Sequence, residues 1–148
     1  MSLVVSDTSA LNYLILCGAV DVLPRLYESV VLPSAVAQEL RHAAAPPSVR
    51  AWIDILPAWA EVRAPSAPDP ATELGLGERE AIALGRELRA TCVLLDDRAA
   101  RRIALEPGLV VAGTVGVLEL AADRNLIALA EEGQQSKDFV NITGPGRV

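Results

Sequence analysis

The sequence contains very few histidine and cysteine residues. It has one histidine, His42, and two cysteines, Cys17 and Cys92, which lie far apart in apolar segments. Two such cysteines are expected to be small buried side chains rather than a disulfide. No glycine-rich loop ends in Lys-Ser or Lys-Thr. The sequence therefore excludes a cysteine-based metal site and a nucleotide-cleaving P-loop.

Long apolar runs and an excess of basic charge are also missing. No stretch approaches the roughly 18 uninterrupted apolar residues of a membrane span. The N-terminus has no basic flank of the kind that precedes a secretory signal, so we expect a cytoplasmic protein. The formal net charge of -6 argues against binding nucleic acid through overall electrostatics. A local basic face remains compatible with that charge.

What the chain does have is enough apolar sequence for one domain with a substantial core. It is 148 residues long and 51% hydrophobic. Short β-branched runs alternate with segments of helical periodicity, which predicts an α/β fold with a parallel sheet covered on both faces. We place the domain in residues 1–132 and interpret residues 133–148 as a tail. The predicted strands are Leu3–Ser6, Val30–Leu32, Val93–Leu95 and Val110–Val111.

An acid and two hydroxyls follow the first predicted strand. Asp7 stands where the strand ends, and Thr8 and Ser9 begin the helix that follows. The carboxyl ends of strands in an open parallel sheet form the edge where ligands bind, which favours a functional role for Asp7. The alternative interpretation is a helix N-cap, because Asp, Thr and Ser all cap helices well.

A second acid lies on the helix predicted from Pro33 to Ala43. In that helix Glu39 lies beside the buried positions Val36 and Leu40, from which it could reach a cleft. The alternative is a solvated glutamate on the helix flank.

Two more acids open the next long helix, after Gly75-Leu76-Gly77. Glu80 lies one turn before Leu84, so we expect it to share the sheet-facing stripe and reach the cleft. Glu78 is the rival candidate, although a simple role at the positive helix end would also account for it. A capping box is a weaker explanation for Glu80, because Gly77 has no side chain to complete the reciprocal bond.

Asp96 and Asp97 are adjacent carboxylates at the end of another predicted strand. Like charges repel and one capping residue would suffice, so the second acid suggests a cation or a shared proton. Thr114 repeats the pattern of a hydroxyl after a strand. Three arginines on the next helix are candidates for ion pairs or phosphate contacts, namely Arg98, Arg101 and Arg102.

Asp7, Asp96 and Asp97 follow strands and Glu80 begins a helix, so these four acids can converge on one edge of the sheet. Glu39 could join them from an adjacent helix. Clustered carboxylates without histidine or cysteine suit hard cations, chiefly Mg²⁺ or Mn²⁺. His42 points away from the predicted core and is a poor candidate for a general base. The pattern therefore indicates a magnesium or manganese site at the sheet edge.

Four stretches taken in order resemble one known family. They are Val-Ser-Asp-Thr-Ser-Ala-Leu, Glu39 on a helix after Val-Val-Leu-Pro, Gly-Glu-Arg-Glu-Ala-Ile, and Val-Leu-Leu-Asp-Asp-Arg. Across roughly residues 3–127 the chain resembles PIN-domain proteins, in particular the bacterial branch of toxin-antitoxin ribonucleases. The resemblance implies a PIN-like three-layer α/β/α fold with a central parallel sheet. It also implies an Mg²⁺- or Mn²⁺-dependent endoribonuclease that acts on RNA, with an antitoxin partner and a homodimeric state.

The same resemblance implies roles for individual residues. Asp7, Glu39, Glu80 and Asp97 match the catalytic acids. The metal ligands would be Asp7, Glu80, Asp96 and Asp97. Ser9 matches the hydroxyl that supports the first acid, and the other supporting residues would be Thr8, Glu78 and Thr114, with Arg98, Arg101 and Arg102 binding RNA.

Three other interpretations compete with an active nuclease. A phosphatase of the haloacid dehalogenase type needs a second aspartate two residues after Asp7, where this chain has Ser9. A receiver-like signalling domain needs a lysine after a late strand, and the one lysine is Lys137 near the end of the chain. The serious alternative is a catalytically silent PIN fold that binds RNA or protein.

Overall fold

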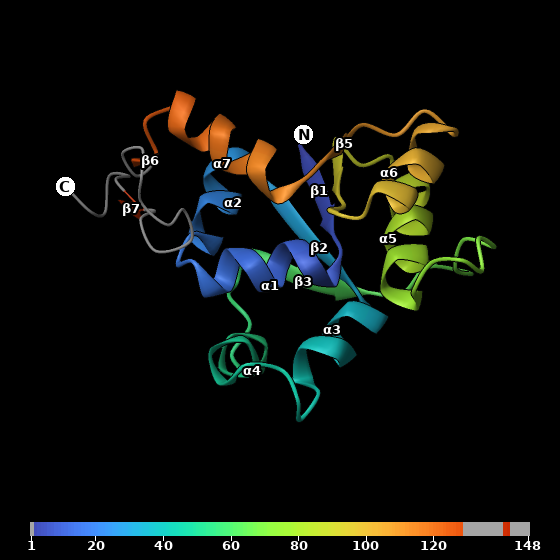
Figure 1. The fold of residues 1–148 in the computed structure, drawn as a ribbon, viewed down its shortest axis with the longest axis horizontal. Helices are drawn as coiled ribbons and strands as arrows, with labels where there is room; N and C mark the ends of the chain where they lie inside the picture. Colours follow the sequence, from blue (N-terminus) through green and yellow to red (C-terminus); the bar gives the residue numbers. More distant parts are fainter. Residues whose placement is uncertain (1, 129–140, 143–148) are drawn as a thin grey trace.

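A five-stranded parallel sheet forms the centre of the molecule (Figure 1). The computed structural model describes residues 2–128 and 141–142 of the chain. The strand order is β3-β2-β1-β4-β5, and every neighbouring pair is parallel. The predicted parallel sheet is therefore confirmed. Its strands are β1 (Leu3–Ser6), β2 (Ser29–Pro33), β3 (Ala60–Arg63), β4 (Cys92–Leu94) and β5 (Val111–Ala112).

Helices cover both faces of this sheet, which gives the predicted three layers (Figure 1). The helices of one layer are α1 (Thr8–Leu16), η1 (Val20–Val22), α2 (Leu23–Leu26), α3 (Ser34–Arg41), α4 (Pro47–Asp54) and α7 (Thr114–Asp123). The other layer contains α5 (Leu76–Glu87) and α6 (Arg98–Leu105).

The two-residue period of the strands divides the core between these layers. Val4 packs with the layer of α1, and Val5, its neighbour in β1, packs with the layer of α5. Both side chains are fully buried. Cys17 and Cys92 are free and buried, as expected. A strand that is covered on both faces has a continuous apolar sequence, which is why β1 could be recognised from the sequence.

The order of the strands creates a switch point beside β1. The chain moves outward from β1 to β2 and β3, then returns to the other side of β1 with β4 and β5. The connections that leave the carboxyl ends of β1 and β4 therefore diverge, and in open α/β sheets ligands bind in the crevice at such a point. Asp7 follows β1, and its backbone N–H donates to the carbonyl of Leu94 in β4 at 3.1 Å.

The end of the chain forms a second, smaller sheet. β6 (Ile127–Ala128) pairs antiparallel with β7 (Asn141–Ile142). The predicted tail, residues 133–148, thus includes one short strand, and the rest of that prediction lies outside the described residues. Within residues 2–128 and 141–142 no single helix is long and apolar enough to cross a membrane, although the bent pair Thr8–Leu16 and Val20–Leu26 passes on length and composition alone.

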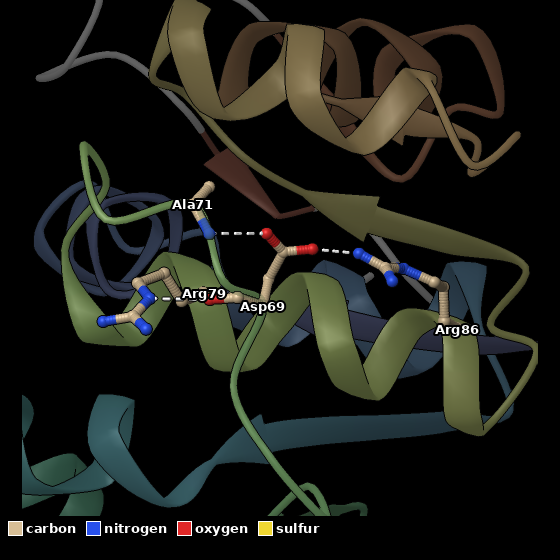
Figure 2. A network of polar contacts seen from close by, with 4 residues as sticks. All are labelled: Asp69, Ala71, Arg79 and Arg86. Carbon is tan, nitrogen blue, oxygen red and sulfur yellow. Dashed lines mark hydrogen bonds and ion pairs between the residues drawn. The ribbon is translucent and has the colours of Figure 1, made fainter.

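A proline-rich connection between β3 and α5 is attached to α5 through Asp69. Asp69 is 6% exposed, and Figure 2 shows its contacts with Ala71, Arg79 and Arg86. Its Oδ1 accepts from the backbone N–H of Ala71 at 3.0 Å, and its Oδ2 forms an ion pair with Arg86. The Asp69 carbonyl accepts from Nε of Arg79 at 2.7 Å. Residues 64–75 are therefore held against α5, whose first turn reaches the crevice.

Candidate functional site

A small polar pocket lies where β1 ends and α5 begins. Its volume is about 120 Å³. Three of the residues that line it are carboxylic acids contributed by three different elements, so the fold brings together acids that are far apart in the sequence. The lining residues are Asp7, Thr8, Ser9, Glu39, Gly75, Gly77 and Glu78.

Asp7 serves as a helix cap through one of its two carboxylate oxygens. Its Oδ1 accepts from the backbone N–H of Ala10 at 2.9 Å, so the capping interpretation is confirmed. Its Oδ2 is buried and has no hydrogen-bond partner among the described residues. Burial, with the nearby Asp96 and Glu78 carboxylates, raises the pKa of Asp7 from 3.8 to about 7, against the opposing effect of the Ala10 hydrogen bond. A cap needs only one oxygen, which leaves the other available for a ligand.

Glu39 reaches this pocket from α3. Its Oε1 accepts a hydrogen bond from the hydroxyl of Thr8, in the first turn of α1. Gly77 makes this contact possible, because a Cβ at that position would lie 2.6 Å from Glu39 Oε1 and 3.2 Å from Thr8 Oγ1. No functional role for Gly77 was predicted from the sequence. Its signal was a glycine within the first turn of a helix, where the helix propensity of the residue is poor.

The positions of Glu78 and Glu80 are the reverse of those expected from the sequence. Glu78 lines the pocket, and its Oε1 also accepts from the backbone N–H of Gly75 at 3.2 Å. Burial, then the nearby Asp97 and Glu39 carboxylates, raises the pKa of Glu78. Glu80 is not among the pocket residues and contacts the N-terminus of α3 instead. The expectation failed because the pocket lies toward α1 and α3, not along the sheet-facing stripe of α5.

Asp97 is the N-cap of α6, and Asp96 accepts hydrogen bonds from the first residue of α7, whose own N-cap is Gly113. Asp96 accepts from the backbone N–H and the hydroxyl of Thr114, at 2.7 and 2.6 Å. Asp97 accepts from the backbone N–H of Ala100 at 2.9 Å. The premise that one cap would suffice is therefore wrong, because β4 ends beside the start of α6 and the start of α7. Both acids remain electrostatically close to the pocket, Asp96 to Asp7 and Asp97 to Glu78.

The three arginines of α6 do not form a single face. A Cβ on Gly113 would lie 3.2 Å from Nη1 of Arg101 and 2.9 Å from Oδ1 of Asp96, which places Arg101 beside the acidic edge. Arg102 instead lines a larger hollow of about 630 Å³, together with Asp69 and Arg86. Arg98 is exposed at the start of α6.

The donor set suits a hydrated hard cation. Mg²⁺ retains several waters and is commonly bound through one or two carboxylates, so it does not require a complete protein cage. Asp7 Oδ2 is a buried carboxylate oxygen that lacks a partner within the described part of the chain. In that same part, no three acid, histidine or cysteine side chains form a ready-made metal cluster. The residues therefore fit a cation held by few direct ligands.

Comparisons with known proteins identify the fold and the family. A family model described as a PIN domain matches residues 3–135. A PilT N-terminus domain protein from the hyperthermophilic archaeon Sulfolobus solfataricus P2 has a similar solved structure, with a TM-score of 0.60 and 18% identity. That similarity covers 90% of this chain and 99% of the archaeal chain. No curated protein matches the sequence. PIN domains are generally nucleases, and PIN nucleases typically use divalent metals. The chain belongs to the PIN-domain family.

Proposed function

We propose that this protein is a divalent-metal-dependent endoribonuclease that hydrolyses RNA phosphodiester bonds at the pocket beside β1. The observation that supports this most is Asp7, whose Oδ2 is buried and has no hydrogen-bond partner among residues 2–128 and 141–142, in a pocket shared with two other acids. A buried carboxylate oxygen costs free energy unless a cation or donor satisfies it. Membership of a nuclease-type family supports the reaction class.

Four acids would hold the metal in this proposal, three of which line the pocket. Asp7 would hold Mg²⁺ or Mn²⁺ directly, and Glu39, Glu78 and Asp97 would hold its waters or complete its ligands. The bound ion would supply electrostatic stabilisation of the phosphate and a water of lowered pKa. Thr8 fixes the carboxylate of Glu39 through its hydrogen bond.

Three further side chains complete the proposed site. Arg101, beside the acidic edge, and the exposed Arg98 are the candidates for phosphate contacts. Ser9 is an exposed hydroxyl at the rim of the pocket, within the first turn of α1. Because the net charge is -6, the overall electrostatic potential of the protein repels RNA. These local contacts must outweigh that repulsion.

Cleavage of a mixed-sequence, end-labelled single-stranded RNA tests the proposal. Wild-type protein should cut it with Mn²⁺ or Mg²⁺ and stop when EDTA is added. Asp7→Asn should be inactive, whereas Asp54→Asn, which changes an exposed acid at the end of α4, should cut at the wild-type rate. If wild-type protein binds RNA but does not cut it with either metal, the proposed activity is wrong and the protein is a catalytically silent binding module.

We also propose that the protein is the toxin of a toxin-antitoxin pair, homodimeric and cytoplasmic, with a protein antitoxin as partner. This part rests on the resemblance of the four sequence stretches to that branch of the family. Induced expression of the wild type should arrest bacterial growth, and expression of Asp7→Asn should not. Co-expression of the neighbouring gene should restore growth; growth arrest by both variants alike would contradict the toxin role.

A further inference from the structure

Glu80 joins the second turn of α5 to the start of α3. Its Oε1 accepts from the hydroxyl of Ser34 at 2.9 Å and from the backbone N–H of Ala35 at 2.8 Å. The N-cap of α3 is Pro33, which makes no side-chain hydrogen bond. The first N–H groups of a helix have no partners within the helix, so α3 obtains an acceptor from another helix. A carboxylate also suits the positive end of the helix dipole.

The same helix α3 delivers Glu39 to the pocket. Glu39 lies in the last turn of α3 and accepts from Thr8, close to the bare backbone of Gly77. Gly77 and Glu80 are three residues apart in α5. One face of α5 therefore contacts α3 twice, once at its N-terminus through Glu80 and once beside Glu39 through Gly77.

We propose that Glu80 is a positioning residue, which fixes α3 against α5 so that the carboxylate of Glu39 stays in the pocket. This inference rests on the proposed nuclease function. It differs from the role that the sequence predicted for Glu80, because Glu80 is not among the residues that line the pocket and its Oε1 instead holds Ser34 and Ala35 at the start of α3.

Substitution by glutamine separates the two roles. Gln keeps a carbonyl oxygen that can accept both hydrogen bonds, although an uncharged acceptor makes them weaker. Glu80→Gln should therefore retain RNA cleavage within about threefold, since the bonds persist in weaker form. Glu80→Ala removes the acceptor and should lower kcat by about 100-fold with little change in KM, the loss expected from an ångström-scale misplacement.

The controls come from the same helix and the same contact. Glu87→Ala removes hydrogen bonds of the same type, from the backbone N–H and hydroxyl of Ser66, without touching α3. It should leave kcat unchanged. Ser34→Ala should reduce kcat modestly in the wild type and have no further effect in Glu80→Ala, because the two residues share one interaction.

A crystal structure of Glu80→Ala tests the inference without relying on activity. The start of α3 should move, and Glu39 should lose its hydrogen bond with Thr8. A Glu80→Ala structure with the Thr8–Glu39 bond intact would overturn the inference, whether or not the wild type cuts RNA. If the wild type is active and Glu80→Gln is as inactive as Asp7→Asn, Glu80 is a catalytic acid and the inference fails, while the proposed function stands. An inactive wild type would instead refute the proposed function.

Discussion

The hydroxyl of Thr8 donates a hydrogen bond to the carboxylate of Glu39, joining the first turn of α1 to the last turn of α3. Thr8 directly follows Asp7, the buried acid at the end of β1. This single bond therefore fixes the second acid of the pocket relative to the first. The same bond explains why residue 77 of α5, which lies against it, is a glycine.

Gly77→Ala should damage the site more than the fold. The new Cβ would lie 2.6 Å from Glu39 Oε1, so the carboxylate must leave its bond with Thr8. We expect RNA cleavage to fall at least about tenfold, as misplaced catalytic groups do. Thermal melting should change little, because the better helix propensity of alanine offsets part of the strain.

Gly116→Ala is the matched control. Gly116 also lies in a helix, α7, and its nearest neighbour there would be Cβ of Ala112 at 3.9 Å. This variant should keep full activity and gain up to about 1 kcal/mol of stability from helix propensity. Equal losses of cleavage in the two variants would show that the space at Gly77 has no special role.

The stability of the metal-free protein should depend on pH through Asp7. Its pKa is raised from 3.8 to about 7, so between these values the folded state holds a proton that the unfolded state releases. The free energy of unfolding should therefore fall as pH rises from about 4 to 7, by about 1.4 kcal/mol per unit at most. Asp7→Asn should lack this slope and be more stable than the wild type above pH 7 in EDTA.

Urea unfolding of both proteins across pH 4 to 8 measures the difference. Asp54→Asn, the exposed control, should follow the wild-type curve. A constant difference between wild type and Asp7→Asn at all pH values would contradict the raised pKa.

Asp96 and Asp97 should separate into a structural and a catalytic acid. Asp97→Asn keeps the cap to Ala100, because asparagine caps helices as well as aspartate does, but it removes the charge near Glu78. We expect an unchanged melting temperature and a large loss of cleavage. Asp96→Asn keeps acceptor and donor atoms for Thr114 and should retain most of the cleavage.

Asp96→Ala, by contrast, should lower stability by about 1–2 kcal/mol, the cost of a lost helix cap. Calorimetry and the RNA assay, run on all three variants, check the assignment. Greater loss of cleavage in Asp96→Asn than in Asp97→Asn would exchange the two roles.

The centre of the sheet was predictable because β1, β2 and β4 are buried and mostly apolar, whereas the edge strand β3 carries the exposed Glu61 and Arg63. Leu3–Ser6 was expected as β1 and is observed with those bounds, and Asp7 was identified from its place after that strand. The orientations of Glu78 and Glu80 were not predictable from helix geometry alone. That geometry gives the angle between the two side chains, but only the packing of α3 against α5 decides which of them faces the pocket.

Asp69 is a buried acid that the sequence analysis missed. It stands between two prolines in the connection between β3 and α5, and an acid in such a sequence is normally solvated. A usable signal existed in Arg79 and Arg86, which lie seven residues apart and therefore on one face of α5. Both arginines contact Asp69 (Figure 2).

Removing the arginine partner should harm the protein more than removing the acid. Arg86→Ala leaves a carboxylate that is 6% exposed without its ion pair, whereas Asp69→Ala leaves an arginine side chain that is 44% exposed. Limited proteolysis should therefore cut within residues 64–75 faster in Arg86→Ala than in Asp69→Ala, and slowest in the wild type. Equal rates in all three proteins would mean that Asp69 does not hold this connection.

Calorimetric titration of Mn²⁺ into the metal-free protein tests the central claim most directly, namely that Asp7 anchors a divalent cation in the pocket. The wild type should bind the ion with release of protons near pH 7, where the raised pKa leaves Asp7 partly protonated. Asp7→Asn should bind at least about tenfold more weakly, a loss of about 1.4 kcal/mol. Undiminished binding by Asp7→Asn, or no binding by the wild type, would contradict the account.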